Sequence, residues 1–333
     1  MNLLFASDDN YSPLLGVTIQ SLLDNNENEF DEISIYVLDG GISSNNKNKL
    51  DEIISESKIN VNLVYVKYEN IDDMIGIDIK ATRALSTYAR LFVCSLLDES
   101  IDKIIYLDCD AIVSSSLEEL WSMDISNYYF GAVLDACPKY VNTILNLPRD
   151  GEHYNAGLLL INLKKWREDN LEKQFLDFII ENDGEVFHND QGILNVICKD
   201  NILKLPPKFN ILSPFFEVGY EKVLKWYNMD DYYTKELVNE ALENPVFIHL
   251  TTFVNGRPWF SNAKNHPLRD KFDYYAKKTP FSDESIYVED NRGFYGKFFS
   301  WTYKYLPYSV ICFMFHTYSF VIEKFHNHIS VGI

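Results

Sequence analysis

The sequence predicts an α/β protein whose central sheet is doubly wound, with a helical extension at its C-terminal end. Short apolar segments rich in β-branched and aromatic residues alternate with longer amphipathic segments, which is typical of strands alternating with helices. Polar residues directly follow several of the apolar segments, as they do where an α/β sheet binds a ligand. Aromatic residues become dense after about residue 280, and this change in composition indicates the extension.

The apolar segments mark the expected strands, which in chain order are 2–6, 33–38, 61–66, 104–107, 129–134, 154–163 and 246–249. The expected helices are 13–23, 43–57, 86–97, 117–121 and 168–181, with a further helix through 193–197 that follows the polar residues 188–191. Pro13 suits the first turn of its helix, where an N–H group would have no partner in any case. The segment 203–210 is expected to be loop and turn. No GxGxxG motif follows the first strand, so the sequence does not support dinucleotide binding.

Composition limits the class of protein. The 333 residues suffice for one large domain with an appendage, and a hydrophobic content of 47% supports a sizeable core. A net charge of −19 argues against nucleic-acid binding, which needs a basic surface. The five cysteines are scattered and form no CxxC pair, which favours a reducing cytoplasm. The N-terminus has no basic segment, so we expect no signal peptide and a cytoplasmic protein.

Residues 281–333 form the predicted extension. The stretch 291–333 carries four basic residues against one acid, a net charge of +3 on an otherwise acidic protein. The uncharged segment 305–322 is interrupted by polar residues and is too polar to be read as a spanning helix. A basic aromatic tail suits homo-oligomer formation or peripheral contact with the inner face of a membrane. The alternative is an ordinary helical cap on the main domain.

Asp108 and Asp110 follow the buried segment 104–107. If the backbone there is extended, residues two apart point to the same face, so both carboxylates converge. Two converging carboxylates repel each other and are costly to desolvate, and a divalent cation between them removes both penalties. The alternative is an Asx-rich turn after a strand.

Several polar residues lie mostly at the ends of expected strands or just beyond them: Asp8, Asn10, Arg90, Asp108, Asp110, Asp135, Asn155, Gln191 and His249. We expect them to line one edge of a parallel sheet, where open α/β sheets bind ligands. Two carboxylates and one imidazole leave open positions on an octahedral ion, and this ligand set suits Mn²⁺, with Mg²⁺ as the second candidate. Diphosphate oxygens are natural ligands for the remaining positions.

Short motifs covering residues 3 to about 259 occur in the order seen in one known family: FASDDNY, STYARL, KIIYLDCDAIV, GAVLDA, YNAGLLLINLKKWR, NDQGILN and the strand that ends in His249. On these motifs the chain resembles glycosyltransferase family 8, which comprises retaining transferases with a GT-A fold. The resemblance implies a Rossmann-like mixed sheet and a nucleotide-sugar transferase domain over residues 1–280, followed by the helical tail.

The resemblance also implies a role for each matching position. Asp108 and Asp110 resemble the family's metal-binding Asp-x-Asp pair, with His249 as the third ligand. The residues implied in binding uridine and ribose are Ala6, Asp8, Asn10, Tyr11 and Cys109. The residues implied around the donor sugar are Arg90, Asp135, Asn155, Ala156, Asp190 and Gln191. Arg257 stands where the family usually has Lys, and it keeps the charge that contacts the diphosphate.

The implied activity is the Mn²⁺-dependent transfer of glucose, galactose or N-acetylglucosamine from a UDP-sugar to a hydroxyl of a bacterial surface glycan. The acceptor would be a glycosylated adhesin, a lipopolysaccharide or a lipid-linked saccharide. Gln191, Asp190 and Arg90 are the implied catalytic residues. Because an amide is a poor nucleophile, we favour front-face attack assisted by the diphosphate, and the alternative is Asp190 as a covalent nucleophile.

Two other functions and several structural roles stay open. A nucleotidyltransferase would need a glycine-rich basic loop after the first strand, which is absent, and a non-catalytic UDP-sugar-binding protein would not need an intact set of site residues. Structural alternatives are an N-cap for Asp8, a strand-end backbone partner for Asn155, an ion pair with a surface acid for Arg90 and a core position for His249. His188 is expected to be a loop histidine.

Overall fold

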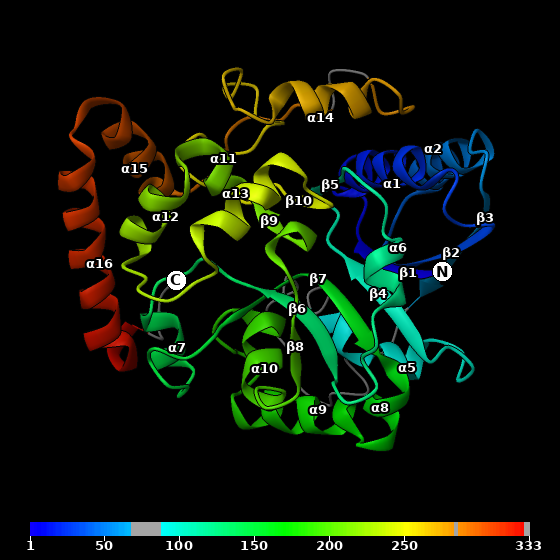
Figure 1. Cartoon of the computed structure of the whole chain (residues 1–333), viewed down its shortest axis with the longest axis horizontal. Coiled ribbons are helices and arrows are strands. Elements are labelled where there is room, and N and C mark those ends of the chain that lie inside the picture. The colour runs from blue at the N-terminus through cyan, green and yellow to red at the C-terminus, as the bar shows by residue number, and fades with distance from the viewer. Residues whose placement is uncertain (68–87, 283–285, 330–333) are drawn as a thin grey trace.

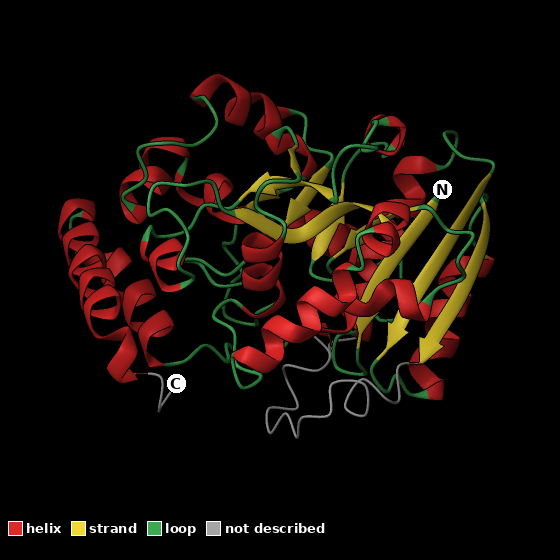
Figure 2. Cartoon of the chain, turned by 90° about the horizontal axis from the view of Figure 1, so that it is seen from below, coloured by secondary structure: helices red, strands yellow, loops and turns green. Residues whose placement is uncertain are grey.

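The computed structural model describes residues 1–67, 88–282 and 286–329 of the chain. Within this described part, the main sheet has seven strands in the order β3-β2-β1-β4-β7-β6-β8 (Figures 1 and 2). These strands are β1 (Asn2–Ser7), β2 (Glu32–Asp39), β3 (Asn60–Lys67), β4 (Lys103–Leu107), β6 (Phe130–Leu134), β7 (Tyr154–Asn162) and β8 (Ile202–Lys204). The α/β class and the mixed sheet expected from the sequence are confirmed.

Strand β7 runs antiparallel to both of its neighbours, β4 and β6. Its first residues therefore lie beside the ends of those strands: Tyr154 pairs with Leu134, and Leu158 pairs with Leu107. The expectation that all these strand ends belong to a parallel sheet is wrong at this strand. The outcome is nevertheless one ligand-binding edge, because the start of an antiparallel strand meets the carboxyl ends of the strands beside it.

A second sheet of three strands adjoins the first within the described residues. It contains β5 (Ala111–Val113), β10 (Phe247–His249) and β9 (Ile211–Leu212), with β10 in the centre. Only residues 108–110 separate β4 from β5. The chain thus bends from the large sheet into the small one at the two acids.

Helices cover both sides of the main sheet, with α1 and α2 on one side and α8, α9 and α10 on the other (Figure 1). The α-helices of the described residues are α1 (Ser12–Asn26), α2 (Ser44–Ser55), α5 (Val93–Leu96), α6 (Glu118–Ser122), α7 (Tyr140–Ile144), α8 (Leu163–Glu168), α9 (Leu171–Glu181), α10 (Asn189–Ile197), α11 (Ser213–Val218), α12 (Tyr220–Tyr227), α13 (Lys235–Glu243), α14 (Arg269–Ala276), α15 (Phe294–Tyr305) and α16 (Tyr308–Ile329). Two 3₁₀ helices, η1 (Ala89–Phe92) and η2 (Pro207–Phe209), complete the set.

Some expected elements differ from the structure. The helix expected at 168–181 is divided, because Asn170 has a left-handed backbone (φ 52°) that ends α8 and precedes α9. Of the helix expected at 86–97, Ser86 and Thr87 lie outside the described residues, and the remainder contains η1 and α5. The segment expected as loop at 203–210 contains part of β8 and all of η2.

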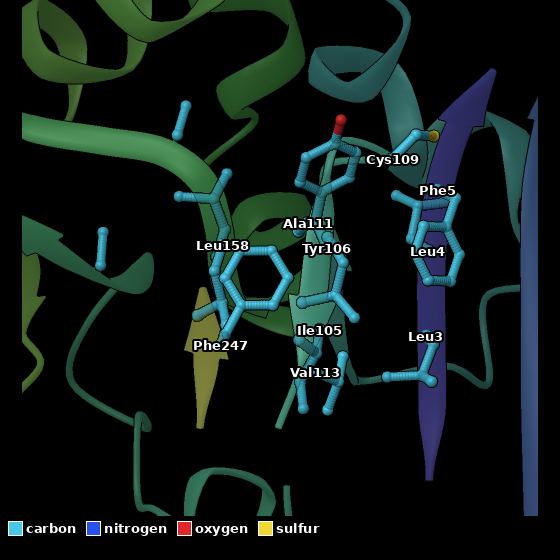
Figure 3. Close-up of a cluster of buried hydrophobic side chains, with 14 of the residues drawn as sticks. Leu3, Leu4, Phe5, Ile105, Tyr106, Cys109, Ala111, Val113, Leu158 and Phe247 are labelled. Atoms are coloured by element: carbon cyan, nitrogen blue, oxygen red, sulfur yellow. The ribbon is translucent and has the colours of Figure 1, made fainter. Parts of the chain in front are cut away.

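The core lies between the two sheets and the helices. Strand β1 contributes Leu3, Leu4 and Phe5, all fully buried, as is Ile105 on β4 (Figure 3). A strand that is buried on both faces is read as a continuous apolar run, which is why these strands were recognisable in the sequence. Their carboxyl ends are held rigidly by this packing, and the functional side chains start where the apolar runs stop.

Helices α15 and α16 form a hairpin beside α12 and α7 (Figure 1). Its inner face closes a second apolar cluster of Trp226, Phe253, Val254 and Ile311. Hydrogen bonds also hold the backbone at Phe253 and Val254. Arg292, just before α15, donates to the Phe253 carbonyl at 2.8 Å, and Ser300 on α15 donates to the Val254 carbonyl at 2.6 Å. Among the described residues, no helix is both long and apolar enough to cross a bilayer.

Candidate active site

Asp108, Asp110 and His249 meet at the edge where the two sheets join. His249 Nε2 lies 3.6 Å from Asp108 Oδ2 and 3.3 Å from Asp110 Oδ1. One ligand atom from each of the three residues lies within 4.8 Å of the others. Two carboxylate oxygens and an imidazole nitrogen form a donor set that fits a divalent cation.

The two carboxylates converge because of the bend rather than because of a strand. Residues 108–110 lie between β4 and β5, so the extended backbone expected there is wrong. The Asp108 N–H donates to the Gly157 carbonyl at 2.8 Å, and the Leu250 N–H donates to the Asp110 carbonyl at 2.9 Å. These bonds hold the backbone of Asp108 against β7 and the backbone of Asp110 against the residue that follows β10.

Cys109, between the two acids, faces the other way. Its side chain is buried, and its thiol lies 3.2 Å from the Ala6 carbonyl at the end of β1 (Figure 3). The Thr18 hydroxyl donates to the Cys109 carbonyl at 2.6 Å. The structure therefore places the Cys109 side chain in the core against β1, and a contact with ribose would have to come from another part of the residue.

Asn155 fixes the tautomer of His249. Its Oδ1 lies 3.2 Å from His249 Nδ1 and also accepts hydrogen bonds from the Gly157 N–H at 2.9 Å and from Asn210 Nδ2 at 2.8 Å. Because that oxygen is an acceptor, His249 Nδ1 carries a hydrogen. Nε2 can offer a lone pair to a cation once it gives up the hydrogen that it otherwise shares with Asp110. Such a partner behind the histidine is usual at metal sites.

This contact changes the interpretation of Asn155. The residue is 6% exposed and its side chain contacts His249, while its expected place beside the donor sugar stays a prediction. The alternative of a strand-end partner is confirmed in part by its bond to Gly157. Close approach also explains the glycine, because a Cβ at residue 157 would lie 2.3 Å from the His249 ring.

Two arginines balance the acids. Arg257 Nη1 contacts Asp110 Oδ2 and donates to the Leu250 carbonyl at 3.0 Å. Burial raises the pKa of Asp110, but the charge of Arg257 and the hydrogen bond from His249 outweigh burial and hold that pKa well below its usual range. Burial lowers the pKa of His249, but the hydrogen bond and charge of Asp110 leave it above its ordinary value.

Arg90 is buried between two acids rather than paired with a surface acid. It donates to Asp108 Oδ1 at 3.0 Å, its Nε lies 3.2 Å from Asp190 Oδ2, and its guanidinium carbon lies 4.0 Å from the centre of the Tyr106 ring. Burial raises the pKa of Asp190 to about 6, although Arg90 opposes this shift. Asp190 is 5% exposed and belongs to the first turn of α10, inside the helix that was expected to begin after it.

Gln191 links α10 to the edge of the sheet. Its Oε1 accepts from the Ala156 N–H at 3.0 Å, and its Nε2 donates to Asp135 Oδ2 at 2.8 Å. Two histidines also face this amide: His153 Nε2 lies 3.2 Å away and His188 Nδ1 lies 3.4 Å away.

Sequence reasoning missed both histidines. His153 directly precedes β7, and only the antiparallel direction of that strand brings it beside Asp135. His188 was expected to be an ordinary loop residue, but its left-handed backbone (φ 61°) directs the chain into α10 next to Gln191. A non-glycine residue rarely adopts this conformation, and the sequence composition does not indicate which residue will do so.

The loop after β1 lies on the same edge. Asp8 Oδ1 accepts from the Tyr11 N–H at 2.9 Å, so Asp8 supports the turn that enters α1, close to the capping alternative. Asn10 is exposed, and the Tyr11 side chain is 46% exposed. Burial raises the pKa of Tyr11, and the charge of Arg257 opposes this shift.

This arrangement can hold a cation between carboxylates and an anion against Arg257, beside an exposed aromatic ring. An α/β protein with a candidate cation site at the ligand-binding edge of its sheet is the class that this arrangement defines. The Glycosyl transferase family 8 model matches residues 2–263, and the chain therefore belongs to that family. It is a glycosyltransferase with the GT-A fold.

Similar proteins agree with this assignment. General stress protein A of Bacillus subtilis is 33% identical over 85% of this chain and 95% of its own length. Lipopolysaccharide 1,2-glucosyltransferase of Escherichia coli K12 is 23% identical over 86% of this chain and 80% of its own length. The crystal structure of the galactosyltransferase LgtC with donor and acceptor sugar analogues superposes with a TM-score of 0.66 at 25% identity, covering 84% of this chain and 96% of that one.

The contact between Gly157 and His249 yields a test of the cation site. In Gly157→Ala the new Cβ must displace the imidazole, because the ring atoms lie 2.3 Å from its position. We expect Mn²⁺ affinity to fall by roughly 10- to 100-fold, the range for a disturbed partner of a metal ligand. Calorimetric titration with Mn²⁺ measures it. Gly293→Ala is the control, since its φ of −63° and open surroundings accept a Cβ, and equal affinities for both variants would contradict the assignment.

Proposed function

We propose that this glycosyltransferase is a retaining hexosyltransferase that uses a UDP-sugar and Mn²⁺, or Mg²⁺ in its place. The observation that carries the proposal is the convergence of Asp108, Asp110 and His249 beside Arg257. Carboxylates and imidazole are suitable ligands for a hard divalent cation. A guanidinium can bind the phosphate oxygens of the diphosphate that the cation does not coordinate. When bound, the cation would stabilise the negative charge that develops on the leaving diphosphate.

Arg257 exchanges partners in this proposal. Without donor it contacts Asp110, and Thr252 accepts from its Nε at 2.8 Å. A cation bound to the carboxylates compensates the charge of Asp110 in place of Arg257. The Arg257 guanidinium is then free to bind the diphosphate. Asp8, Asn10 and Tyr11 lie at the end of the neighbouring strand β1, where they can hold the uracil and ribose.

Gln191 and Asp190 have different places in the reaction. The Gln191 amide reaches the edge of the sheet between Ala156 and Asp135, whereas Asp190 is buried behind Arg90. We therefore favour front-face attack. The anomeric carbon–oxygen bond breaks, UDP leaves with the bonding electrons, and the acceptor hydroxyl attacks from the same side. The proton of the acceptor hydroxyl passes to a diphosphate oxygen. Because the hydroxyl attacks the anomeric carbon directly, no protein carboxylate has to form a glycosyl ester.

A cavity of about 460 Å³ is lined by Asp135 and His153, which both contact Gln191, and it supports an acceptor site there. It runs from Asp135 and His153 to the side chains of Lys139, Lys204 and Asp230. Lys139 is itself paired with Asp150 and Asp230, and the walls are polar, with three basic and five acidic side chains in the lining. Such walls suit the hydroxyls of a neutral saccharide. Similarity to a lipopolysaccharide glucosyltransferase supports a surface glycan as the acceptor.

The exposed side chains of the α15–α16 hairpin support the proposal that the protein associates with the inner surface of a membrane. Phe294, Trp301, Tyr305 and Phe313 are 76%, 57%, 68% and 72% exposed. Lys297, Lys304 and Lys324 lie on the same two helices, and the lone acid, Glu323, is paired with Arg149. Exposed aromatic rings among lysines suit an anionic lipid surface, which would bring the enzyme to lipid-linked acceptors.

Donor use is tested by measuring UDP release from UDP-glucose, UDP-galactose and UDP-N-acetylglucosamine, with and without Mn²⁺. We expect one of them to be hydrolysed slowly, and only with a divalent cation. Asp110→Asn should lower this rate by at least about 100-fold, because the cation loses a ligand and Arg257 loses its partner. A nucleotidyltransferase would instead transfer the uridylyl group and release the sugar 1-phosphate. Binding of every UDP-sugar without release of UDP would establish a non-catalytic protein.

The mechanism is tested at Gln191. In front-face attack the amide orients and stabilises rather than bonding to the sugar, so Gln191→Ala should keep measurable transfer, reduced by about 10- to 1,000-fold. Mass spectrometry of the wild type with a slow donor should show no glycosyl adduct. Complete loss of transfer together with an adduct on Asp190 would establish covalent catalysis.

Membrane association is tested by co-sedimentation with vesicles of phosphatidylglycerol or phosphatidylcholine. We expect binding to the anionic vesicles only, reduced at least about tenfold by the double change Trp301→Ser and Phe313→Ser, because both rings lose their burial in the lipid surface. Tyr274→Ser is the matched control, since this 56% exposed ring lies on α14, away from the hairpin. Vesicle binding unaffected by the double change would contradict the proposal, and a dimer that this change dissociates would assign the face to a second copy.

A further inference from the structure

A second group of metal-ligating side chains lies beside Gln191, separate from the acid pair at the bend. Asp135, Cys137 and His153 each offer one ligand atom, and these atoms lie within 4.8 Å of one another. Asp135 and Cys137 follow β6, and His153 precedes β7. The pairing of β6 with β7 brings them together, since Leu134 is opposite Tyr154 and the Asp135 N–H donates to the His153 carbonyl at 2.7 Å.

The hydrogen bonds around His153 prepare it as a ligand. Asn142 donates through Nδ2 to the Gly151 carbonyl at 2.8 Å, which identifies Asn142 Oδ1 as the acceptor that faces His153 Nδ1 at 3.0 Å. His153 Nδ1 therefore carries the hydrogen, and Nε2 presents its lone pair towards Gln191. A histidine whose second nitrogen is held by an amide oxygen has the arrangement that metal ligands usually have.

The cluster has more lone pairs than hydrogens. Gln191 Nε2 has two hydrogens, yet it faces three acceptors: Asp135 Oδ2 at 2.8 Å, His153 Nε2 at 3.2 Å and His188 Nδ1 at 3.4 Å. If His188 Nδ1 carries a lone pair, no amide hydrogen is left for it. If it carries a hydrogen, that hydrogen faces the two hydrogens of the amide. A cation resolves this surplus, because it uses lone pairs that the amide cannot satisfy.

We propose that Asp135, Cys137 and His153 bind Zn²⁺ and that this ion inhibits the transferase. A thiol, an imidazole and a carboxylate form a mixed sulfur, nitrogen and oxygen donor set, which suits Zn²⁺ better than the harder Mn²⁺ or Mg²⁺. The cavity of about 460 Å³ is lined by all three residues and is the path by which the ion enters. On binding, Cys137 forms a sulfur–zinc bond and its proton leaves to water.

Inhibition follows from the hydrogen bonds that the ion removes. Zn²⁺ would occupy the lone pairs of Asp135 and His153, which now accept from Gln191 Nε2, so the amide would lose its position at the sheet edge. Only this inhibitory consequence rests on the proposed function, whereas the metal site itself stands on the geometry of the three ligands. Saturating Mn²⁺ at Asp108 and Asp110 would not relieve the inhibition, because the two sites have no ligand in common.

Direct binding is tested with Co²⁺, which replaces Zn²⁺ and gives a thiolate charge-transfer absorption that oxygen and nitrogen ligands do not give. With the acid-pair site filled by Mg²⁺, we expect this absorption in the wild type and in Cys94→Ser, a variant of a half-buried thiol elsewhere in the fold, and its loss in Cys137→Ser. Asn142→Ala should weaken Co²⁺ binding by roughly 10- to 100-fold. No thiolate absorption in the wild type, or the same absorption in Cys137→Ser, would overturn the proposal.

The inhibitory effect is tested by Zn²⁺ titration of UDP release at saturating Mn²⁺, each variant being compared with its own rate without Zn²⁺. The Zn²⁺ concentration for half inhibition should rise at least about tenfold in Cys137→Ser and stay unchanged in Cys94→Ser. Equal inhibition of both variants would overturn the inhibitory role. If the chain releases no UDP from any donor, the proposed function fails, and the Co²⁺ absorption still decides the metal site.

Discussion

The structure depends on two acids at the bend between its two sheets. Asp110 is largely buried, and Asp108 is only partly exposed, so their charges would be costly without nearby compensation. Compensation comes from three distant parts of the chain: Arg90 from the 3₁₀ helix before β4, His249 from the end of β10 and Arg257 from the loop beyond it. The fold is thus tied together where the cation and diphosphate are proposed to bind.

Strand β7 serves this cluster with three consecutive residues. Asn155 orients His249, Ala156 accepts from Arg90 and donates to Gln191, and Gly157 accepts from the Asp108 N–H while leaving room for the imidazole. Backbone groups supply most of these contacts. The strand therefore couples the metal side of the site to the Gln191 side, and a shift of one register position would disconnect both.

The C-terminal hairpin is part of the same construction. Its inner face packs on Phe253 and Val254, a few residues before Arg257. Ser300 donates to the Val254 carbonyl, and Arg292, just before the hairpin, donates to the Phe253 carbonyl. The loop that positions the guanidinium is thus supported by the C-terminal helices. A hairpin that only capped the fold would not need its exposed aromatic rings, so its two faces have different tasks: one supports the loop and the other contacts a membrane in our proposal.

The sequence by itself determined the α/β class, nearly all strands of the main sheet, the acid pair and the family, because these follow from local periodicity and from motifs within short segments. It also indicated the helical tail through composition. Only the tertiary structure decided the direction of β7, the place of Asn155 behind His249, the burial of Cys109 and the gathering of Cys137, His153 and His188 around Gln191. The physical reason is that strand pairing and backbone bends join residues far apart in the chain, and a periodicity of two or 3.6 residues holds no information about which distant segment lies alongside.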